Sequence, residues 1–152
     1  MRVAALFLAA ALAGAAAQEQ YVFHVNIGGA KKTFEVELHS SWAPLGAARF
    51  AQLAEEPGFF DGVRFFRAIK SFMVQFGIAG KPSVAARWKD DKILDDPVVE
   101  SNVRGHLSFA TSGKDSRTTQ MFIVREGNGR ASRPAHISRF AFALPRSLAR
   151  RI

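Results

Sequence analysis

The stretch Phe65-Phe-Arg-Ala-Ile-Lys-Ser-Phe-Met-Val-Gln-Phe-Gly77 decides the fold, because it predicts two short strands joined by a tight turn. Apolar side chains alternate with other side chains on either side of Lys70-Ser71, which is the pattern of an antiparallel hairpin. The first strand of this hairpin is predicted to begin at Val63.

Alternation places Arg67 on the same face of its strand as Phe65 and Ile69. The same rule places Phe72 and Phe76 on one face of the second strand. A cation among inward-facing apolar groups is costly unless it is paired or used. Arg67 is therefore a candidate functional residue, and a salt bridge or a solvated position at the rim is the structural alternative.

The same stretch resembles the signature of the cyclophilins, which are peptidyl-prolyl cis-trans isomerases. The pattern is Phe65-x-Arg-x-Ile-x-x-Phe-Met-x-Gln-x-Gly77. A second block, Gly105-His-Leu-Ser-Phe-Ala-Thr-Ser-Gly113, is followed by Thr119-Gln-Met-Phe-Ile123 in the order that the family has. Two blocks at family spacing are a specific signal, and the resemblance runs from about Tyr21 to Arg130.

The resemblance implies a mostly β fold, a cyclophilin-like antiparallel barrel capped by helices. Residues 20–130 are predicted to form this domain, without its C-terminal strands. Residues 131–152 form a divergent basic tail. After Arg130 a cyclophilin would continue through Leu-Asp and a Gly-Phe-x-x-Phe-Gly strand, and the sequence has neither. The switch at Ala131 is typical of a changed reading frame, a mis-spliced gene model or a truncated isoform.

Residues 1–17 are predicted to be a secretory signal peptide. Arg2 precedes an apolar run, Val3–Leu12, which is shorter than the roughly 20 residues that a membrane span needs. Ala15 and Ala17 give the small-residue cleavage pattern, so Gln18 is the expected mature N-terminus. We expect the secretory pathway, either the lumen of the endoplasmic reticulum or the extracellular space, and no stable membrane anchor.

Two further elements are predicted before the central hairpin. Strand patterns over residues 21–27 and 33–38 flank Gly28-Gly29, which predicts an antiparallel hairpin. A helix follows, with Ser40 or Ser41 as its cap and Pro44 in its first turn, and Pro57-Gly58 ends it. We expect this helix to plug one end of the barrel.

A long connection, residues 78–104, contains four aspartates between Asp90 and Asp96. A calcium site of the EF-hand type needs alternating ligands, a glycine at the turn and a closing glutamate, and this pattern is absent. We therefore interpret these aspartates as solvated loop charges. No metal and no cofactor is expected.

The net charge of +8 does not indicate a nucleic-acid partner. The excess belongs to the tail, which contains no acidic residue and these arginines: Arg133, Arg139, Arg146, Arg150 and Arg151. A nucleic-acid surface would instead cluster Lys and Arg on one face, among aromatic residues. The chain has no cysteine, which excludes disulfides and thiol chemistry.

The resemblance assigns the chemistry of X–Pro isomerisation to named residues. Arg67 would be catalytic, because its guanidinium can hydrogen-bond the amide nitrogen as the bond twists. Phe72, Met73 and Phe122 would line the proline pocket. Gln75 would position Arg67 and bind the substrate backbone, Gln120 would support the rim, and the main chain of Ala110 and Thr111 would meet the peptide.

The predicted function is acceleration of X–Pro isomerisation during protein folding. The resemblance implies proline-containing peptides, unfolded proteins and cyclosporin-type cyclic peptides as partners. Two alternatives remain, a proline-peptide binding or chaperone-like module without turnover, and an inactive truncated product. In the family, further pocket-wall positions fall on Arg130, Ala131 and Ala135, and the two alanines are too small to enclose a proline ring. We therefore predict little turnover for the chain as written.

Overall fold

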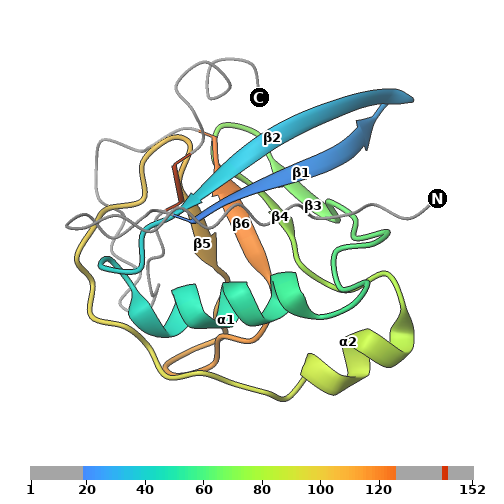
Figure 1. The fold of residues 1–152 in the computed structure, drawn as a ribbon. Helices are drawn as coiled ribbons and strands as arrows, with labels where there is room; N and C mark the ends of the chain where they lie inside the picture. Colours follow the sequence, from blue (N-terminus) through green and yellow to red (C-terminus); the bar gives the residue numbers. More distant parts are fainter. Residues whose placement is uncertain (1–18, 126–141, 144–152) are drawn as a thin grey trace, which may run out of the picture.

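The computed structural model describes residues 19–125 and 142–143, whose strands form two antiparallel sheets (Figure 1). The first sheet has the order β1-β2-β7, and the second has the order β3-β4-β6-β5. The strands are β1 (Glu19–Ile27), β2 (Ala30–Leu38), β3 (Arg67–Ile69), β4 (Met73–Phe76), β5 (Leu107–Phe109), β6 (Met121–Val124) and β7 (Phe142–Ala143). The helices are α1 (Pro44–Glu55) and α2 (Pro82–Trp88).

The predicted N-terminal hairpin is confirmed as β1 and β2, which pair from Glu19↔Leu38 to Ile27↔Ala30. Gly28 and Gly29 form its two-residue turn with φ of 58° and 84°. Positive φ at both central positions is what a turn matched to the twist of the strands requires, and glycine adopts it without strain.

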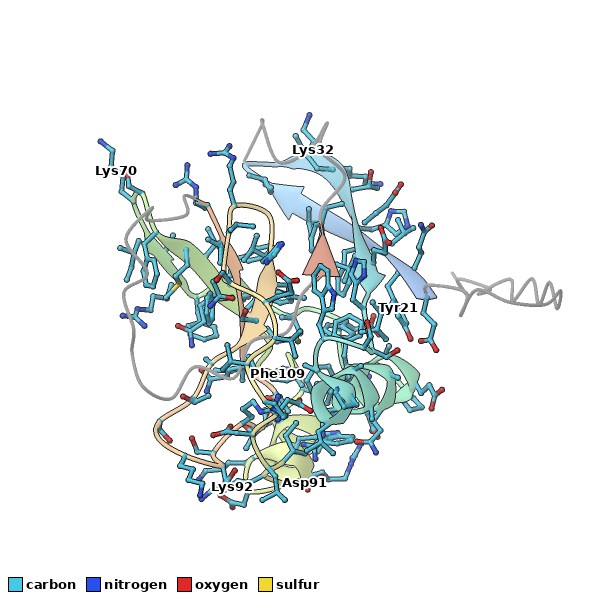
Figure 2. The ribbon with its side chains drawn as sticks, turned by 90° about the vertical axis from the view of Figure 1, so that its left-hand side faces the viewer. Tyr21, Lys32, Lys70, Asp91, Lys92 and Phe109 are labelled. Atoms are coloured by element: carbon cyan, nitrogen blue, oxygen red, sulfur yellow. The ribbon has the colours of Figure 1, made fainter. Side chains whose placement is uncertain are left out.

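One aromatic core joins the two sheets to α1. The ring of Phe23 on β1 stacks on Phe34 at 4.8 Å and meets Phe60 edge to face at 5.0 Å. Phe50 and Leu53 of α1 are fully buried in the same cluster, which also contains Phe109. Figure 2 places Phe109 in the interior of the molecule. The helix thus covers one end of the sheets, as the predicted amphipathic face requires.

The predicted serine cap of α1 is wrong. The N-cap residue is Ala43, which makes no side-chain cap, and Pro44 begins the helix. The carboxylate of Asp96 instead accepts hydrogen bonds from the backbone N–H groups of Leu45, at 2.9 Å, and Gly46, at 3.1 Å. A carboxylate from about fifty residues away in the chain therefore satisfies the free donors of the first turn.

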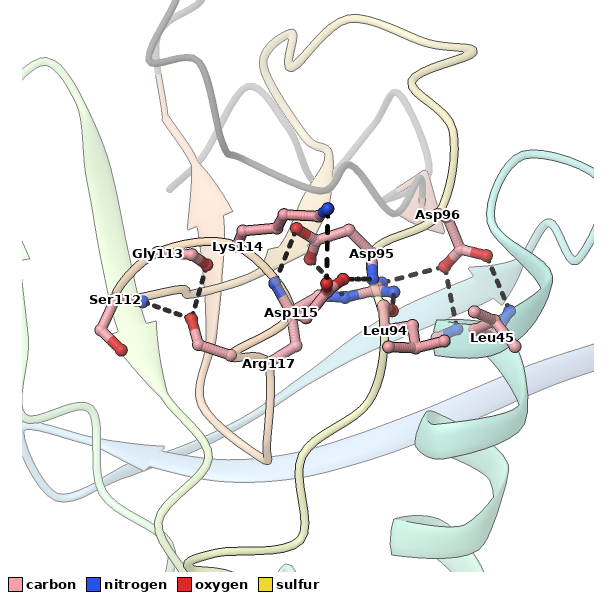
Figure 3. A network of polar contacts seen from close by, with 11 residues as sticks. Leu45, Leu94, Asp95, Asp96, Ser112, Gly113, Lys114, Asp115 and Arg117 are labelled. Carbon is pink, nitrogen blue, oxygen red and sulfur yellow. Dashed lines mark hydrogen bonds and ion pairs between the residues drawn. The ribbon is translucent and has the colours of Figure 1, made fainter.

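The interpretation of the loop aspartates as solvated charges is also wrong for Asp95 and Asp96, whereas Asp91 stays exposed although it pairs with an arginine. Asp96 is 5% exposed and accepts a 2.9 Å hydrogen bond from the fully buried guanidinium of Arg117 (Figure 3). Asp95 lies 3.4 Å from Nε of Arg117, and Asp91 pairs with the buried Arg49 at 3.1 Å. These carboxylates neutralise the buried guanidinium groups of Arg49 and Arg117.

The central hairpin is present, with a different turn and shorter strands than predicted. β3 begins at Arg67, and the turn takes residues 70–72, with φ of 58° at Ser71. Phe72 therefore lies in the turn, outside the strand alternation, and does not share a face with Phe76. Phe65 precedes β3 and packs 5.2 Å from Phe76, so it does not lie beside Arg67.

The two sheets do not form one continuous ring within the part of the chain that the structure describes. The short strand β7 pairs with the end of β2, at Glu37↔Ala143 and Leu38↔Phe142. The divergent basic tail thus contributes two paired residues. The predicted signal peptide, residues 1–17, lies outside the described residues, as do Arg130, Ala131 and Ala135. Among those described, no helix has the length and apolarity to cross a membrane.

Replacing Asp96 by Asn should lower the free energy of unfolding by about 3–5 kcal/mol, because it removes the more buried and closer of the two carboxylates that neutralise Arg117 and leaves Asp95. The matched control is Asp90→Asn in the same loop, where the side chain is exposed and the change should stay within about 0.5 kcal/mol. Urea unfolding of both variants checks this. Equal midpoints for the two would contradict the assigned role of Asp96.

Candidate functional site

A small pocket opens on the face of β3 and β4 that points away from the aromatic core. Its volume is about 190 Å³. The lining residues come from β3, β4, the turn between them and the β5–β6 region: Arg67, Phe72, Met73, Gln75, Phe109, Ala110, Thr111 and Phe122. Sites for drug-sized ligands usually have about 300–1,000 Å³, so this pocket fits a single side chain or ring.

A chain of polar side chains crosses the rim of this pocket. Arg67 donates from Nη1 to Oε1 of Gln75 at 3.3 Å, and Gln75 donates from Nε2 to Oε1 of Gln120 at 2.9 Å. Arg67 and Gln75 are direct cross-strand partners in the β3–β4 register. Gln75 is only 7% exposed, so its amide is held by its surroundings and fixes the guanidinium in turn.

The structure corrects the expected burial of Arg67. Its side chain is exposed at the rim and is not enclosed by apolar groups, so it carries no large desolvation cost. A guanidinium has five N–H donors, and the bond to Gln75 uses one of them. Among the described residues Gln75 is the hydrogen-bond partner of this guanidinium, so its other donors can reach a ligand in the pocket.

Gly77 allows Gln120 to come this close to Gln75. Its φ is +102°, and a Cβ atom there would lie 2.3 Å from the carbonyl oxygen of Thr119. No real contact is that short, so any other residue would push the 119–121 segment away from the end of β4.

The apolar floor of the pocket has a fixed part, whose side chains are buried, and a free part, whose side chain is partly exposed to solvent. Met73 and Phe122 are 4% and 6% exposed and pack in a small second core with Val124. Phe72 is 36% exposed, and its ring lies 6.4 Å from that of Phe122. Its position in the β3–β4 turn leaves it as a wall with solvent on its other side.

The remaining wall comes from the end of β5. The N–H of Ala110 donates to the carbonyl of Gln120 at 2.8 Å, which leaves the Ala110 carbonyl as the main-chain group that can meet a peptide there. Phe109 also lines the pocket and was not among the predicted site residues. Its position inside the second motif block, directly before Ala110, was the available signal.

The structure thus brings seven of the eight predicted site residues into one pocket, and the eighth, Gln120, is bonded to Gln75. Nothing in the pocket resembles a metal site. Among the described residues, no group of three or more His, Cys, Asp or Glu side chains is placed to hold a metal ion.

Comparison with known proteins supports the interpretation of the motifs. A family model described as cyclophilin type peptidyl-prolyl cis-trans isomerase/CLD matches residues 22–138. Peptidyl-prolyl cis-trans isomerase B of Bacillus subtilis is 36% identical over 92 residues, which is 60% of this chain and 64% of that protein. Peptidyl-prolyl cis-trans isomerase-like 2 of Gibberella zeae is 36% identical over 94 residues, which is 59% of this chain and 16% of that protein. The chain therefore spans less than two thirds of the length of either relative.

The fold has solved counterparts. The crystal structure of the Mimivirus cyclophilin matches with a TM-score of 0.64 and 14% identity, over 90% of this chain and 77% of that one. This likeness concerns the fold, and it confirms the predicted cyclophilin-like arrangement of strands and helices.

The fixed and free parts of the floor should differ in their contribution to stability. Phe122→Ala should cost about 3–5 kcal/mol, because it removes a buried ring and leaves a cavity next to Met73. Phe72→Ala should cost less than about half of this, since its ring already contacts solvent. Urea denaturation measures both values. A larger loss of stability for Phe72→Ala than for Phe122→Ala would contradict the assignment of Phe122 to the fixed part of the floor and Phe72 to the free part.

Proposed function

Because the chain belongs to the family of cyclophilin-type peptidyl-prolyl cis-trans isomerases, we propose that the pocket beside Arg67 accelerates the isomerisation of X–Pro peptide bonds. The observation that carries the proposal is the ordered Arg67–Gln75–Gln120 chain above an apolar floor of the size of one ring. The substrates are proline-containing segments of peptides and unfolded proteins. Cyclosporin-type cyclic peptides belong to the same proposal, since they would use the same pocket.

The reaction needs no nucleophile. An X–Pro bond exchanges over about tens to hundreds of seconds, because resonance holds the amide planar with a barrier of about 18–20 kcal/mol. Twisting makes the proline nitrogen pyramidal and gives it a lone pair. A donor that reaches this lone pair stabilises the twisted state more than the planar one, and that difference is catalysis.

Each part of the pocket contributes to this difference. Met73 and Phe122 form a rigid apolar floor for the proline ring, and Phe72 closes one side. Arg67, held by Gln75, presents its free N–H donors at the rim. The Ala110 carbonyl lies where it can hold the substrate backbone while the bond turns.

Arg67→Ala should lower kcat/KM for a proline-containing test peptide at least tenfold, equivalent to about 1.4 kcal/mol of transition-state stabilisation. Arg64→Ala is the matched control, because Arg64 is also exposed, lies three residues away and does not line the pocket. It should leave turnover within about twofold. Wild-type turnover in Arg67→Ala would refute the role of this guanidinium.

These rates require a form of the chain with measurable turnover. Residues 131–152 carry small residues at the family's further wall positions, so the chain as written should turn over far more slowly than the Bacillus relative. A chimera that replaces residues 131–152 by the C-terminal segment of that relative should regain activity, and the two arginine variants are compared in it. Full activity of the unmodified chain would overturn the interpretation of the tail.

A second candidate is a proline-peptide binding module without turnover. The observation that favours it is the half-open pocket, in which Phe72 stays 36% exposed. Saturable binding of proline peptides by the chimera, without any acceleration of isomerisation, would select this alternative.

For the cellular setting we propose the secretory pathway, on the basis of Arg2, the apolar run Val3–Leu12 and the Ala15-x-Ala17 pattern. The first described strand begins at Glu19, so cleavage after Ala17 would leave every described element intact.

Secreted expression should yield a mature chain that starts at Gln18, since the apolar run is too short to remain as a stable span. N-terminal sequencing of the secreted protein checks this. Recovery of the chain in the membrane fraction with Met1 retained would contradict it.

A further inference from the structure

A second hollow lies at the end of the β3–β4 hairpin that is opposite to its turn. Its volume is about 660 Å³, and it is formed by the segment before β3, residues 61–66, and the segment after β4, residues 78–81. Phe66 and Ile78 are its large apolar side chains, and we call it the Phe66 hollow. Among the described residues it shares no lining residue with the Arg67 pocket, so the proposed function assigns it no role.

The β3–β4 ladder places this hollow close to Arg67. Phe66 directly precedes Arg67, and its backbone N–H donates to the carbonyl of Gln75 at 3.1 Å. Arg67 and Gln75 are cross-strand partners, and both line the pocket. Ile78 follows Gln75 by three residues, which span about 10 Å in an extended chain. A peptide bound in the pocket therefore comes to the hollow within about three residues of its proline.

The side chain of Phe66 points away from the core, as that of Arg67 does. Phe65 packs on the buried Phe76, with ring centroids 5.2 Å apart, and neighbouring side chains of an extended chain point to opposite sides. The alternation does not continue from Arg67 back to Phe65, because β3 begins only at Arg67. A ligand in the Arg67 pocket can therefore reach Phe66 along the outer surface.

Exposed aromatic rings gather around Arg67. In residues 19–125 the exposed phenylalanines are Phe65, Phe66 and Phe72, while the other phenylalanines of this range are buried or half-buried. Phe66 is 46% exposed and Ile78 is 44% exposed. Single exposed apolar side chains are common on protein surfaces, but two from separate segments that line one hollow beside a pocket are typical of an interaction site.

Gly80 brings the two walls of the hollow together. A Cβ atom at this position would lie 2.7 Å from the carbonyl oxygen of Asp61 and 2.9 Å from that of Gly62. The 61–62 turn therefore packs directly against residue 80, and any side chain there would push the two segments apart. The close approach fixes the distance between the walls.

Charge does not dominate the lining of the hollow. Its charged side chains carry both signs and are Asp61, Arg64 and Lys81. Oδ2 of Asp61 and Nζ of Lys81 each lie 3.4 Å from the position that a Cβ atom of Gly58 would take. These two opposite charges are therefore close neighbours and largely offset each other. The apolar pair Phe66 and Ile78 determines what the hollow binds.

We propose that the Phe66 hollow is a substrate subsite that takes a large apolar side chain about two or three residues from the proline. The proposal rests on the proposed function, because a proline in the Arg67 pocket is what brings the rest of the peptide to the hollow. Contact with Phe66 and Ile78 removes apolar surface of both partners from water. The hollow lies at one end of the pocket, so it selects the sequence on one side of the proline only.

The test measures the Kd of fluorescent peptides for the full 152-residue chain by anisotropy. The reference peptide has one proline among alanines, and four further peptides carry leucine two or three residues before or after the proline. Leucine on one side of the proline should lower Kd by about fivefold or more, because part of its side chain leaves water. The ratio of the reference Kd to the leucine Kd is the gain.

Two variants test the walls of the hollow. Phe66→Ala and Ile78→Ala should each reduce the gain to less than about twofold, since each removes an apolar wall. Leu94→Ala is the matched control, because Leu94 is 64% exposed and lines neither the hollow nor the pocket, and it should keep the full gain. Arg67→Ala should weaken the reference and leucine peptides by the same factor. Circular dichroism checks that every variant keeps the fold.

The outcomes separate this subsite from the proposed function. The subsite is refuted, and the proline pocket stands, if the reference peptide binds and the gain is absent, occurs on both sides of the proline, or survives both wall variants. Tighter binding with glutamate than with leucine at the same position would show that charge selects the ligand. Equal binding of a leucine peptide without proline would assign the hollow to another ligand. Failure of every proline peptide to bind would overturn the proline pocket and the subsite together.

Discussion

The buried charge of Arg117 is the constraint on which the arrangement of this domain depends. Its guanidinium is fully buried, so it must be neutralised inside the protein. Asp96 neutralises this charge and also accepts hydrogen bonds from the first two backbone N–H groups of α1 (Figure 3). Leu94 accepts a further hydrogen bond from the same guanidinium through its carbonyl. One ion pair thus joins the start of α1, the long connection before β5 and the loop before β6.

This junction extends to the candidate site through the β5–β6 loop. Asp95 and Asp115 bond to each other's backbone N–H groups at 2.8 Å and 3.0 Å, and Ser116 ties Ser112 and Gly113 into the same loop. The loop begins at Ala110 and ends at Gln120, which both belong to the site. A buried ion pair adds little net stability, yet breaking it is costly, so its main effect is to hold this loop in one conformation.

The β3–β4 hairpin separates two surfaces with different chemistry. One face carries Arg67 and Gln75 above a pocket for a single ring. The other face carries Phe76, which belongs to the aromatic core. Strand alternation produces this division, because neighbouring side chains of β4 point to opposite sides. The pocket for a single ring and the aromatic core therefore lie on opposite faces of the same hairpin.

The sequence by itself determined the local elements and most of the residues that line the candidate pocket. Alternating strands, Gly28-Gly29 and Pro44 located the first hairpin and α1, and the two motif blocks named seven of the eight lining residues. These features follow from local sterics and from residue types at fixed spacing, which a linear sequence records directly. The short helix α2 was missed, because seven residues without a side-chain cap leave too weak a pattern.

Only the tertiary structure decided how distant residues combine. The cap of α1 is Asp96 and neither Ser40 nor Ser41, and the loop aspartates neutralise Arg49 and Arg117. The turn takes three residues where two were predicted, so Phe72 lies in the turn and lines the pocket, outside the alternation of β4. Each of these depends on which groups meet across many residues of chain, since a buried charge or an open helix end takes the nearest partner in space. Sequence order does not contain that distance.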